Sequence, residues 1–168
     1  MKSFKTFLTE GYAGNYVCIE AEDLSSFFKD LNLPEPKSGT IPPDFHCTLI
    51  YSERSVIEPE RISSVMRSSG FDKKYVANIN GFKLFDCPED SEKVSLVATL
   101  DSPELLQLHD FLKGMGLLHS YKEFMPHITL RYAMDSAEAA KYKELLNGKT
   151  MSVTMANFRS ETINKNYV

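Results

Sequence analysis

The sequence predicts an α+β fold with two pseudo-symmetric lobes, in which antiparallel sheets flank a central cleft and helices lie outside. The hexapeptide HCTLIY at 46–51 is nearly repeated as HITLRY at 127–132, which is 127 − 46 = 81 positions later. Around each copy the apolar and turn-forming residues give the same order of elements: strand, helix, histidine-containing strand, helix and strand. We therefore expect a single domain over 1–168 made of two repeats, at about 15–86 and 92–163.

In the first repeat, the sequence predicts strands at 15–21, 45–52 and 74–86, where apolar and β-branched residues are frequent. The first helix is expected to start at Asp23 as its N-cap and to end before Pro34. The second helix is expected at 59–68, with Pro59 near its start and Gly70 after its end.

The second repeat has the same pattern, with strands predicted at 92–101, 124–133 and 150–163. Its first helix should begin after Ser102 as N-cap, with Pro103 in the first position. A second helix is expected at about 136–146, closed by Gly148.

Composition excludes several classes of protein. The chain of 168 residues is 42% hydrophobic with a net charge of −4, which argues against a broad basic face for long nucleic acid. No apolar run has the length of a membrane span, and no signal peptide is visible. Three widely spaced cysteines (Cys18, Cys47 and Cys87) suggest reduced thiols in a cytoplasm. The oligomeric state is left open.

The hexapeptides carry the candidate chemistry. Side chains alternate along a strand, so His46 and Thr48 share one face, and so do His127 and Thr129, with Arg131 continuing the second face. If both faces line the cleft, one imidazole can accept a proton while the other donates one, and the threonine hydroxyls can bind phosphate oxygens. The sequence has no HxH or HExxH ligand pattern, so we expect catalysis without a metal or other cofactor.

Other polar residues are secondary candidates. Lys83, Lys122 and Arg159 could neutralise phosphate charge. His109 and His119 have no counterpart in the other repeat, so we expect them to be structural.

The paired sequences HCTL and HITL on this framework resemble the two HxT motifs of the 2H phosphoesterase superfamily. The resemblance covers roughly residues 15–163 and implies the LigT-like fold of that superfamily, with His46, Thr48, His127 and Thr129 as catalytic residues. Members act without metal on RNA 2′,3′-cyclic phosphates, 2′–5′ oligoadenylates, RNA tails or cyclic oligonucleotides. The motif pair itself does not specify the substrate.

The segments MKSFKTFLTE (1–10) and IPPDFHCTLIYS (41–52) are similar to those of phage-encoded anti-CBASS phosphodiesterases. That resemblance implies hydrolysis of the cyclic di- and trinucleotide signals of bacterial antiphage immunity, in the cytoplasm of the infected host. It also implies that Tyr12, Glu161 and Tyr167 clamp the bases of a cyclic oligonucleotide.

Two alternatives remain open. The chain could be a 2H phosphodiesterase that acts on RNA 2′,3′-cyclic phosphate ends or 2′–5′ linked ends, although its acidity disfavours this. The N-terminal segment also resembles those that direct internal proteins into phage proheads and are cleaved after a glutamate, here Glu10. The protein would then be a packaged phage protein without catalysis.

Overall fold

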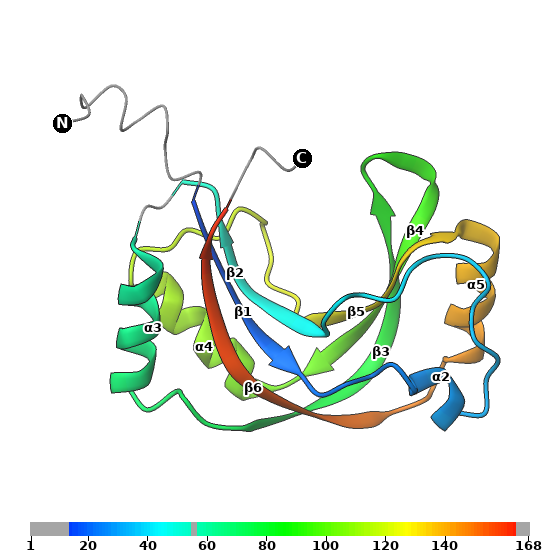
Figure 1. Cartoon of the computed structure of the whole chain (residues 1–168), viewed down its shortest axis with the longest axis horizontal. Helices are drawn as coiled ribbons and strands as arrows, with labels where there is room; N and C mark the ends of the chain where they lie inside the picture. Colours follow the sequence, from blue (N-terminus) through cyan, green and yellow to red (C-terminus); the bar gives the residue numbers. More distant parts are fainter. Residues whose placement is uncertain (1–13, 55–56, 164–168) are drawn as a thin grey trace.

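The computed structural model describes residues 14–54 and 57–163, which have the predicted α+β architecture (Figure 1). Six antiparallel strands form one sheet in the order β2-β1-β6-β3-β4-β5. The strands are β1 (Asn15–Ala21), β2 (His46–Ser52), β3 (Tyr75–Cys87), β4 (Asp90–Asp101), β5 (His127–Asp135) and β6 (Met151–Thr162). The helices are α2 (Phe27–Asp30), α3 (Pro59–Ser68), α4 (Pro103–Gly114) and α5 (Ser136–Leu145). No helix of the described ranges has the length and apolar character needed to cross a bilayer.

Each half of the sheet combines strands from both sequence repeats. Strand β6, from the second repeat, pairs with β1, whereas β3, from the first repeat, pairs with β4. We call β2, β1 and β6 the first lobe and β3, β4 and β5 the second lobe. Pairing of β3 with β6 joins the two lobes into one continuous sheet. The exchange of the last strands makes each lobe depend on the other repeat for its fold.

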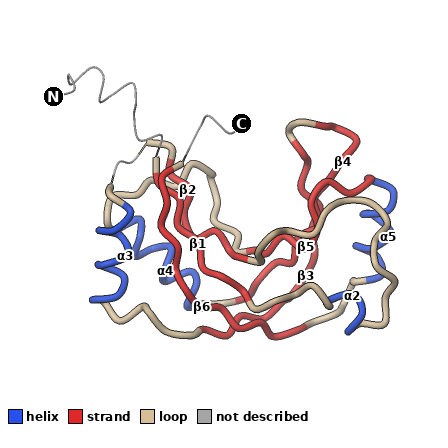
Figure 2. The backbone as a smooth tube through the Cα atoms, viewed as in Figure 1, coloured by secondary structure: helices blue, strands red, loops and turns tan. Residues whose placement is uncertain are grey.

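The helices lie outside the sheet, at its two ends (Figure 2). Helices α3 and α4 pack on the first lobe, and α5 packs on the second. Helix α4 begins as predicted, because the Ser102 hydroxyl accepts a hydrogen bond from the Leu105 backbone N–H at 3.2 Å. Its buried side chains (Leu105, Leu108, His109 and Leu112) face the core.

Helix α2 is much shorter than predicted. The Asp23 carboxylate accepts the Ser25 backbone N–H at 2.9 Å, which closes a turn around Leu24 and delays the helix to Phe27. Asn32, with a φ of 57°, ends the element. Leu24, Phe27 and Phe28 are buried all the same and Leu31 is partly buried, so the periodicity predicted the core face correctly but not the backbone conformation.

The sheet curves so that its two edge strands meet. Strands β2 and β5 are first and last in the strand order, yet their Cα atoms come within 8 Å of each other. The two hexapeptides therefore lie side by side across the middle of the molecule, although 81 positions separate their histidines.

Candidate active site

A bulge at the same place in both hexapeptides decides which side chains share a face. Thr48 lies opposite Cys18 and Ile50 opposite Val17, so two steps along β2 correspond to one step along β1. Strand β5 repeats this arrangement against β4, with Thr129 opposite Val97. The extra residue shifts the alternation, so the tyrosine in the sixth position returns to the face of the histidine and threonine.

Because of this shift, the prediction that Arg131 continues the site face is wrong. Arg131 is 6% exposed, and its Nη2 donates to a Glu35 carboxylate oxygen at 3.0 Å and to the Pro36 carbonyl at 3.3 Å. Its guanidinium carbon also lies 5.9 Å from the centroid of the Phe28 ring. Arg131 therefore attaches the segment before β2 to the second lobe and does not face the cavity.

The shared face lines a cavity of about 560 Å³. Thr48 and Tyr51 of the first lobe and His127, Thr129 and Tyr132 of the second lobe all contribute to its wall. The other lining residues come from β3, β4, the β3–β4 turn and the segment 119–125: Phe85, Asp86, Pro88, Ser95, Val97, His119, Tyr121, Glu123, Phe124 and Met125. The structure thus brings Thr48 of the first motif to the same cavity as His127 and Thr129 of the second, whereas His46 is not among the lining residues.

His127 is held in one tautomer. Its Nδ1 lies 2.8 Å from the Met125 carbonyl oxygen, which can only accept, so Nδ1 carries the proton and Nε2 of the neutral ring has a free lone pair. Burial lowers the pKa of His127 below its usual value, and the nearby charge of His46 lowers it further. A neutral imidazole with a free Nε2 can accept a proton.

His46 has a different environment. Its Nδ1 lies 3.5 Å from a carboxylate oxygen of Asp44, without a hydrogen bond to any described residue. Its ring makes an edge contact with Tyr16, at 6.2 Å between centroids. The Asp44 carboxylate is also paired with Arg159, which in turn lies 3.6 Å from Glu20. A carboxylate beside the ring can compensate the positive charge of an imidazolium.

The residues that lie next to Thr48 and Thr129 on the neighbouring strands differ between the two lobes. Cys18 lies between Thr48 and Arg159 in the first lobe, whereas Val97 lies between Thr129 and Lys83 in the second. Burial raises the pKa of Tyr16, which is on the same face of β1 as Cys18, while hydrogen bonding to Thr48 acts in the opposite direction. The phenol of Tyr16 is therefore protonated and close to the Thr48 hydroxyl.

The two remaining histidines have different surroundings. His109 is buried, with Nδ1 2.6 Å from the Leu49 carbonyl and its ring stacked on Phe124, which fits a structural residue. His119 lines the cavity, although the sequence interpretation treated it only as a structural residue. Its Nδ1 accepts the Tyr51 backbone N–H at 3.3 Å, which anchors the cavity wall.

The sequence interpretation missed Tyr51 and Tyr132. Both line the cavity, and the signal was present, since tyrosine is the sixth residue of both hexapeptides. Simple alternation placed the sixth residue on the opposite face from the histidine, and only the bulge corrects this.

The predicted base-clamping residues are partly outside the described chain. Tyr12 and Tyr167 lie outside the described residues, as does Glu10. Glu161 is exposed on β6 and lies opposite Tyr16, on the face that also carries Arg159. Within 14–54 and 57–163, no group of three or more histidine, cysteine, aspartate or glutamate residues could hold a metal ion.

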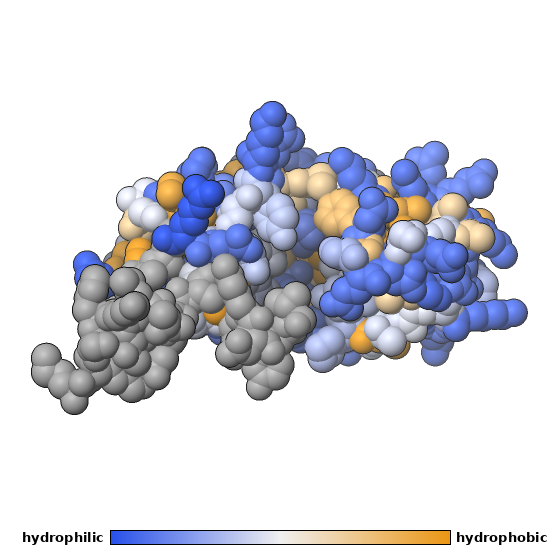
Figure 3. All heavy atoms as spheres, turned by 90° about the horizontal axis from the view of Figure 1, so that it is seen from above, coloured by the Kyte–Doolittle hydropathy of each residue, from blue (hydrophilic) through white to orange (hydrophobic). Residues whose placement is uncertain are grey.

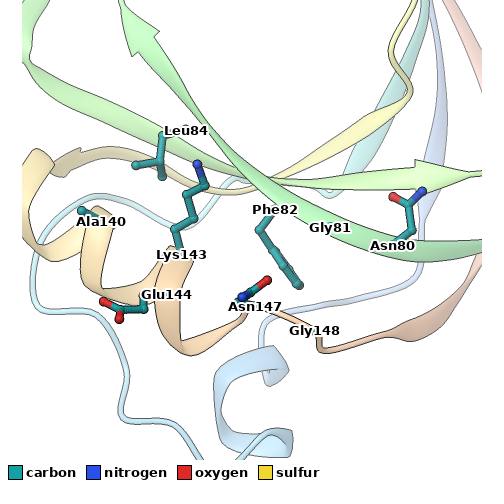
Figure 4. Close-up of a pocket in the computed structure, with 9 residues that line it drawn as sticks. All are labelled: Asn80, Gly81, Phe82, Leu84, Ala140, Lys143, Glu144, Asn147 and Gly148. Atoms are coloured by element: carbon teal, nitrogen blue, oxygen red, sulfur yellow. The ribbon is translucent and has the colours of Figure 1, made fainter.

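A second hollow, of about 510 Å³, lies on the other side of β3 against α5 (Figure 4). Its polar side chains are Asn80, Lys143, Glu144 and Asn147, and neither HxT motif contributes to it. It lacks a paired acid and base of the kind that the two histidines provide.

Comparison with known proteins places this arrangement in a family. A family model described as anti-CBASS protein Acb1 matches residues 12–167. The anti-CBASS protein Acb1 of Vibrio phage KVP40 is 29% identical over 125 residues, which are 71% of this chain and 72% of that protein. The protein of the same name from Enterobacteria phage T4 is 28% identical over 134 residues, 79% of this chain and 78% of that protein.

A solved structure of Usb1 from Kluyveromyces marxianus matches with a TM-score of 0.53 and 10% identity, over 91% of this chain and 95% of that chain. This likeness concerns the fold alone. It confirms the predicted α+β fold class.

Proposed function

This chain belongs to the family of the anti-CBASS protein Acb1, and from that premise we propose that it is a metal-independent phosphodiesterase. Its proposed substrates are cyclic di- and trinucleotide immune signals, whose 3′–5′ bonds it hydrolyses in the cytoplasm of the infected bacterial host. Destruction of these signals blocks CBASS defence. The observation that carries the proposal is the meeting of both HxT motifs at one cavity.

The two histidine environments suggest separate roles. Nε2 of His127 removes the proton of the ribose 2′-OH, and the 2′-oxygen attacks phosphorus in line. His46, with its positive charge compensated by Asp44, gives a proton to the departing 5′-oxygen. The product is a 2′,3′-cyclic phosphate, which water opens with the roles of the histidines exchanged.

The threonines support the phosphate. Hydroxyls of Thr48 and Thr129 reach the cavity from opposite lobes, where they can donate to the non-bridging oxygens. Charge on these oxygens is largest in the transition state, so these hydrogen bonds accelerate the reaction more than they strengthen binding of the substrate.

We assign one base of the substrate to Tyr12, Glu161 and Tyr167. The described chain begins and ends side by side, since the Ile163 backbone N–H donates to the Gly14 carbonyl at 3.1 Å. Glu161 lies two positions before Ile163, at this end of the first lobe, and the assignment of Tyr12 and Tyr167 follows from the resemblance of the sequence to the anti-CBASS phosphodiesterases.

The test is incubation of the purified full chain with a panel of cyclic di- and trinucleotides in EDTA, with products identified by mass. Linear products should appear, with 2′,3′-cyclic phosphate ends as intermediates. RNA with 2′,3′-cyclic phosphate ends and a 2′–5′ linked oligoadenylate complete the panel. Turnover of these linear substrates alone, or activity that returns only with added Mn²⁺ or Zn²⁺, would overturn the proposal.

A further inference from the structure

The segment 117–125 brings aromatic side chains to the cavity beside the second HxT motif. Tyr121 lies 6.0 Å from Tyr51 and 5.6 Å from His119 between ring centroids, and Phe124 and Tyr132 line the same wall. Tyr121 is 64% exposed, so much of its side chain is accessible to a ligand. In a view from above, apolar side chains (orange) border a hollow near the middle of the molecule (Figure 3).

Hydrogen bonds fix this segment on the first lobe. The Ser120 backbone N–H donates to the Tyr51 carbonyl at 2.8 Å, and the Ser120 hydroxyl accepts the Glu53 N–H at 2.9 Å. His119 accepts the Tyr51 N–H, and Phe124 stacks on His109 with 3.9 Å between centroids and 9° between planes. The aromatic wall is therefore in position before a ligand arrives, which reduces the entropic cost of binding.

The charges of this part of the cavity suit a base better than a phosphate. Asp86 and Glu123 are its charged lining residues. Carboxylates repel a phosphodiester but accept hydrogen bonds from the exocyclic amino groups of nucleobases. Phe85, Pro88 and Val97 supply apolar surface at the same wall.

We propose that the aromatic wall formed by Tyr51, His119, Tyr121, Phe124 and Tyr132 is a stacking subsite for a second base of the substrate. The proposal rests on the proposed function and extends it. Tyr51 of this wall lies opposite Tyr16, which in turn lies opposite Glu161, so the wall and Glu161 are separated by strand β1 of the first lobe. With the scissile phosphate at the threonines, one base lies towards Glu161 and the other stacks on this wall.

The test uses Tyr121, because its exposed side chain can be changed without disturbing the core. Dissociation constants for a cyclic dinucleotide are measured in the His46→Ala background, which stops turnover. Stacking of one base on an aromatic side chain predicts that Tyr121→Ala weakens binding about 5- to 150-fold. Tyr121→Phe, which keeps the ring, should bind as the background does. Leu145→Ala removes an exposed apolar side chain from α5, far from the cavity, and should also have no effect.

A spectroscopic arm reports stacking directly. The sequence contains no tryptophan, so Tyr121→Trp introduces a single indole at the proposed wall. Titration of this variant, made in the His46→Ala background, with a cyclic dinucleotide should quench the indole fluorescence. The dissociation constant from this quenching should equal that of the His46→Ala variant alone.

The outcomes separate the two proposals. If the wild-type chain cleaves cyclic dinucleotides but Tyr121→Ala binds as tightly as Tyr121→Phe, the subsite is wrong and the proposed function stands. The same conclusion holds if the indole fluorescence of the Tyr121→Trp variant does not respond or if Leu145→Ala weakens binding equally. If the wild-type chain cleaves no cyclic oligonucleotide, both proposals fall.

Discussion

The hexapeptides of β2 and β5 are equivalent where they face the cavity and different behind it. Position five is Ile50 in the first lobe and Arg131 in the second, and both side chains are buried on the far side of the bulge. Ile50 packs in the apolar core, whereas Arg131 binds Glu35. The two lobes are therefore alike in the histidines and threonines that we assign to one phosphate. They differ in the supporting residues behind them, such as Ile50 and Arg131.

The segments that cross between the lobes show the same contrast. Thr40 and Tyr132 exchange two backbone hydrogen bonds of 2.9 Å, as Ser120 bonds to Tyr51 in the other lobe. Gly39 allows the first of these crossings, because a Cβ there would lie 2.6 Å from the Tyr132 carbonyl oxygen and the φ is +80°. Only the second crossing, 117–125, carries aromatic rings to the cavity. We therefore assign anchoring to the segment that contains Gly39 and Thr40, and substrate contact to 117–125.

We expect the largest effect from substitution of either histidine of the pair. Positioned acid–base catalysis is worth about 10² to 10⁴ per group, so His46→Ala and His127→Ala should each lose that much turnover of a cyclic dinucleotide. The double variant should be little worse than either, because groups that act as a unit are not additive. Circular dichroism and thermal melts provide the control for folding. If His127→Ala keeps most of the wild-type turnover, the two motifs do not form one site.

Removal of one threonine hydroxyl should have a smaller effect. Thr48→Val and Thr129→Val keep the side-chain shape and remove a transition-state donor, which typically costs about 100-fold in kcat. The effect should fall on kcat with KM nearly unchanged. Serine at either position restores a hydroxyl and should recover most of the activity. Equal turnover of both valine variants and the wild type would remove the hydroxyls from the mechanism.

The pH dependence should distinguish the two imidazoles. Burial lowers the pKa of His127, and the neutral form is the base, so turnover should persist as pH falls through about 6.5 and drop only below the lowered pKa. Below that point the rate should fall about tenfold per pH unit. NMR titration of the ring should show the same lowered pKa, and His46→Gln should raise it by removing a nearby charge. A His127 pKa above the ordinary histidine value would contradict the assignment of His127 as base.

The smallest effect concerns the position that differs between the motifs. Arg131→Met should lower the free energy of unfolding by about 1–2 kcal/mol, because the contacts to Glu35 and Pro36 are lost while half-exposed Glu35 stays solvated. Its kcat should stay close to that of the wild type. Ile50→Val, at the equivalent position of the first lobe, should cost about 0.5–1.5 kcal/mol by cavity formation. If Arg131→Met loses turnover without losing stability, Arg131 contacts the substrate phosphate after all.

Local patterns predicted much of this protein. Runs of apolar and β-branched residues identified the six strands of the described chain, and Ser102 and Pro103 marked the start of α4, because strand propensity and capping depend on residues close in sequence. The repeated His and Thr predicted two equivalent strands, and the structure brings three of these four side chains to one cavity wall with His46 beside it. The short α2 escaped prediction because the turn at Asp23 competes with the helix that the apolar spacing favours.

What the sequence by itself determined is the element order, the fold class and the pair of HxT motifs. Tertiary structure alone decided which residues join them. The bulges in β2 and β5 turned Tyr51 and Tyr132 towards the cavity and Arg131 away from it, and a bulge depends on the register with a partner strand. The approach of the 117–125 segment to Tyr51 likewise brought His119 and Tyr121 to a site formed by residues about 70 positions earlier, since packing between distant segments has no local signature.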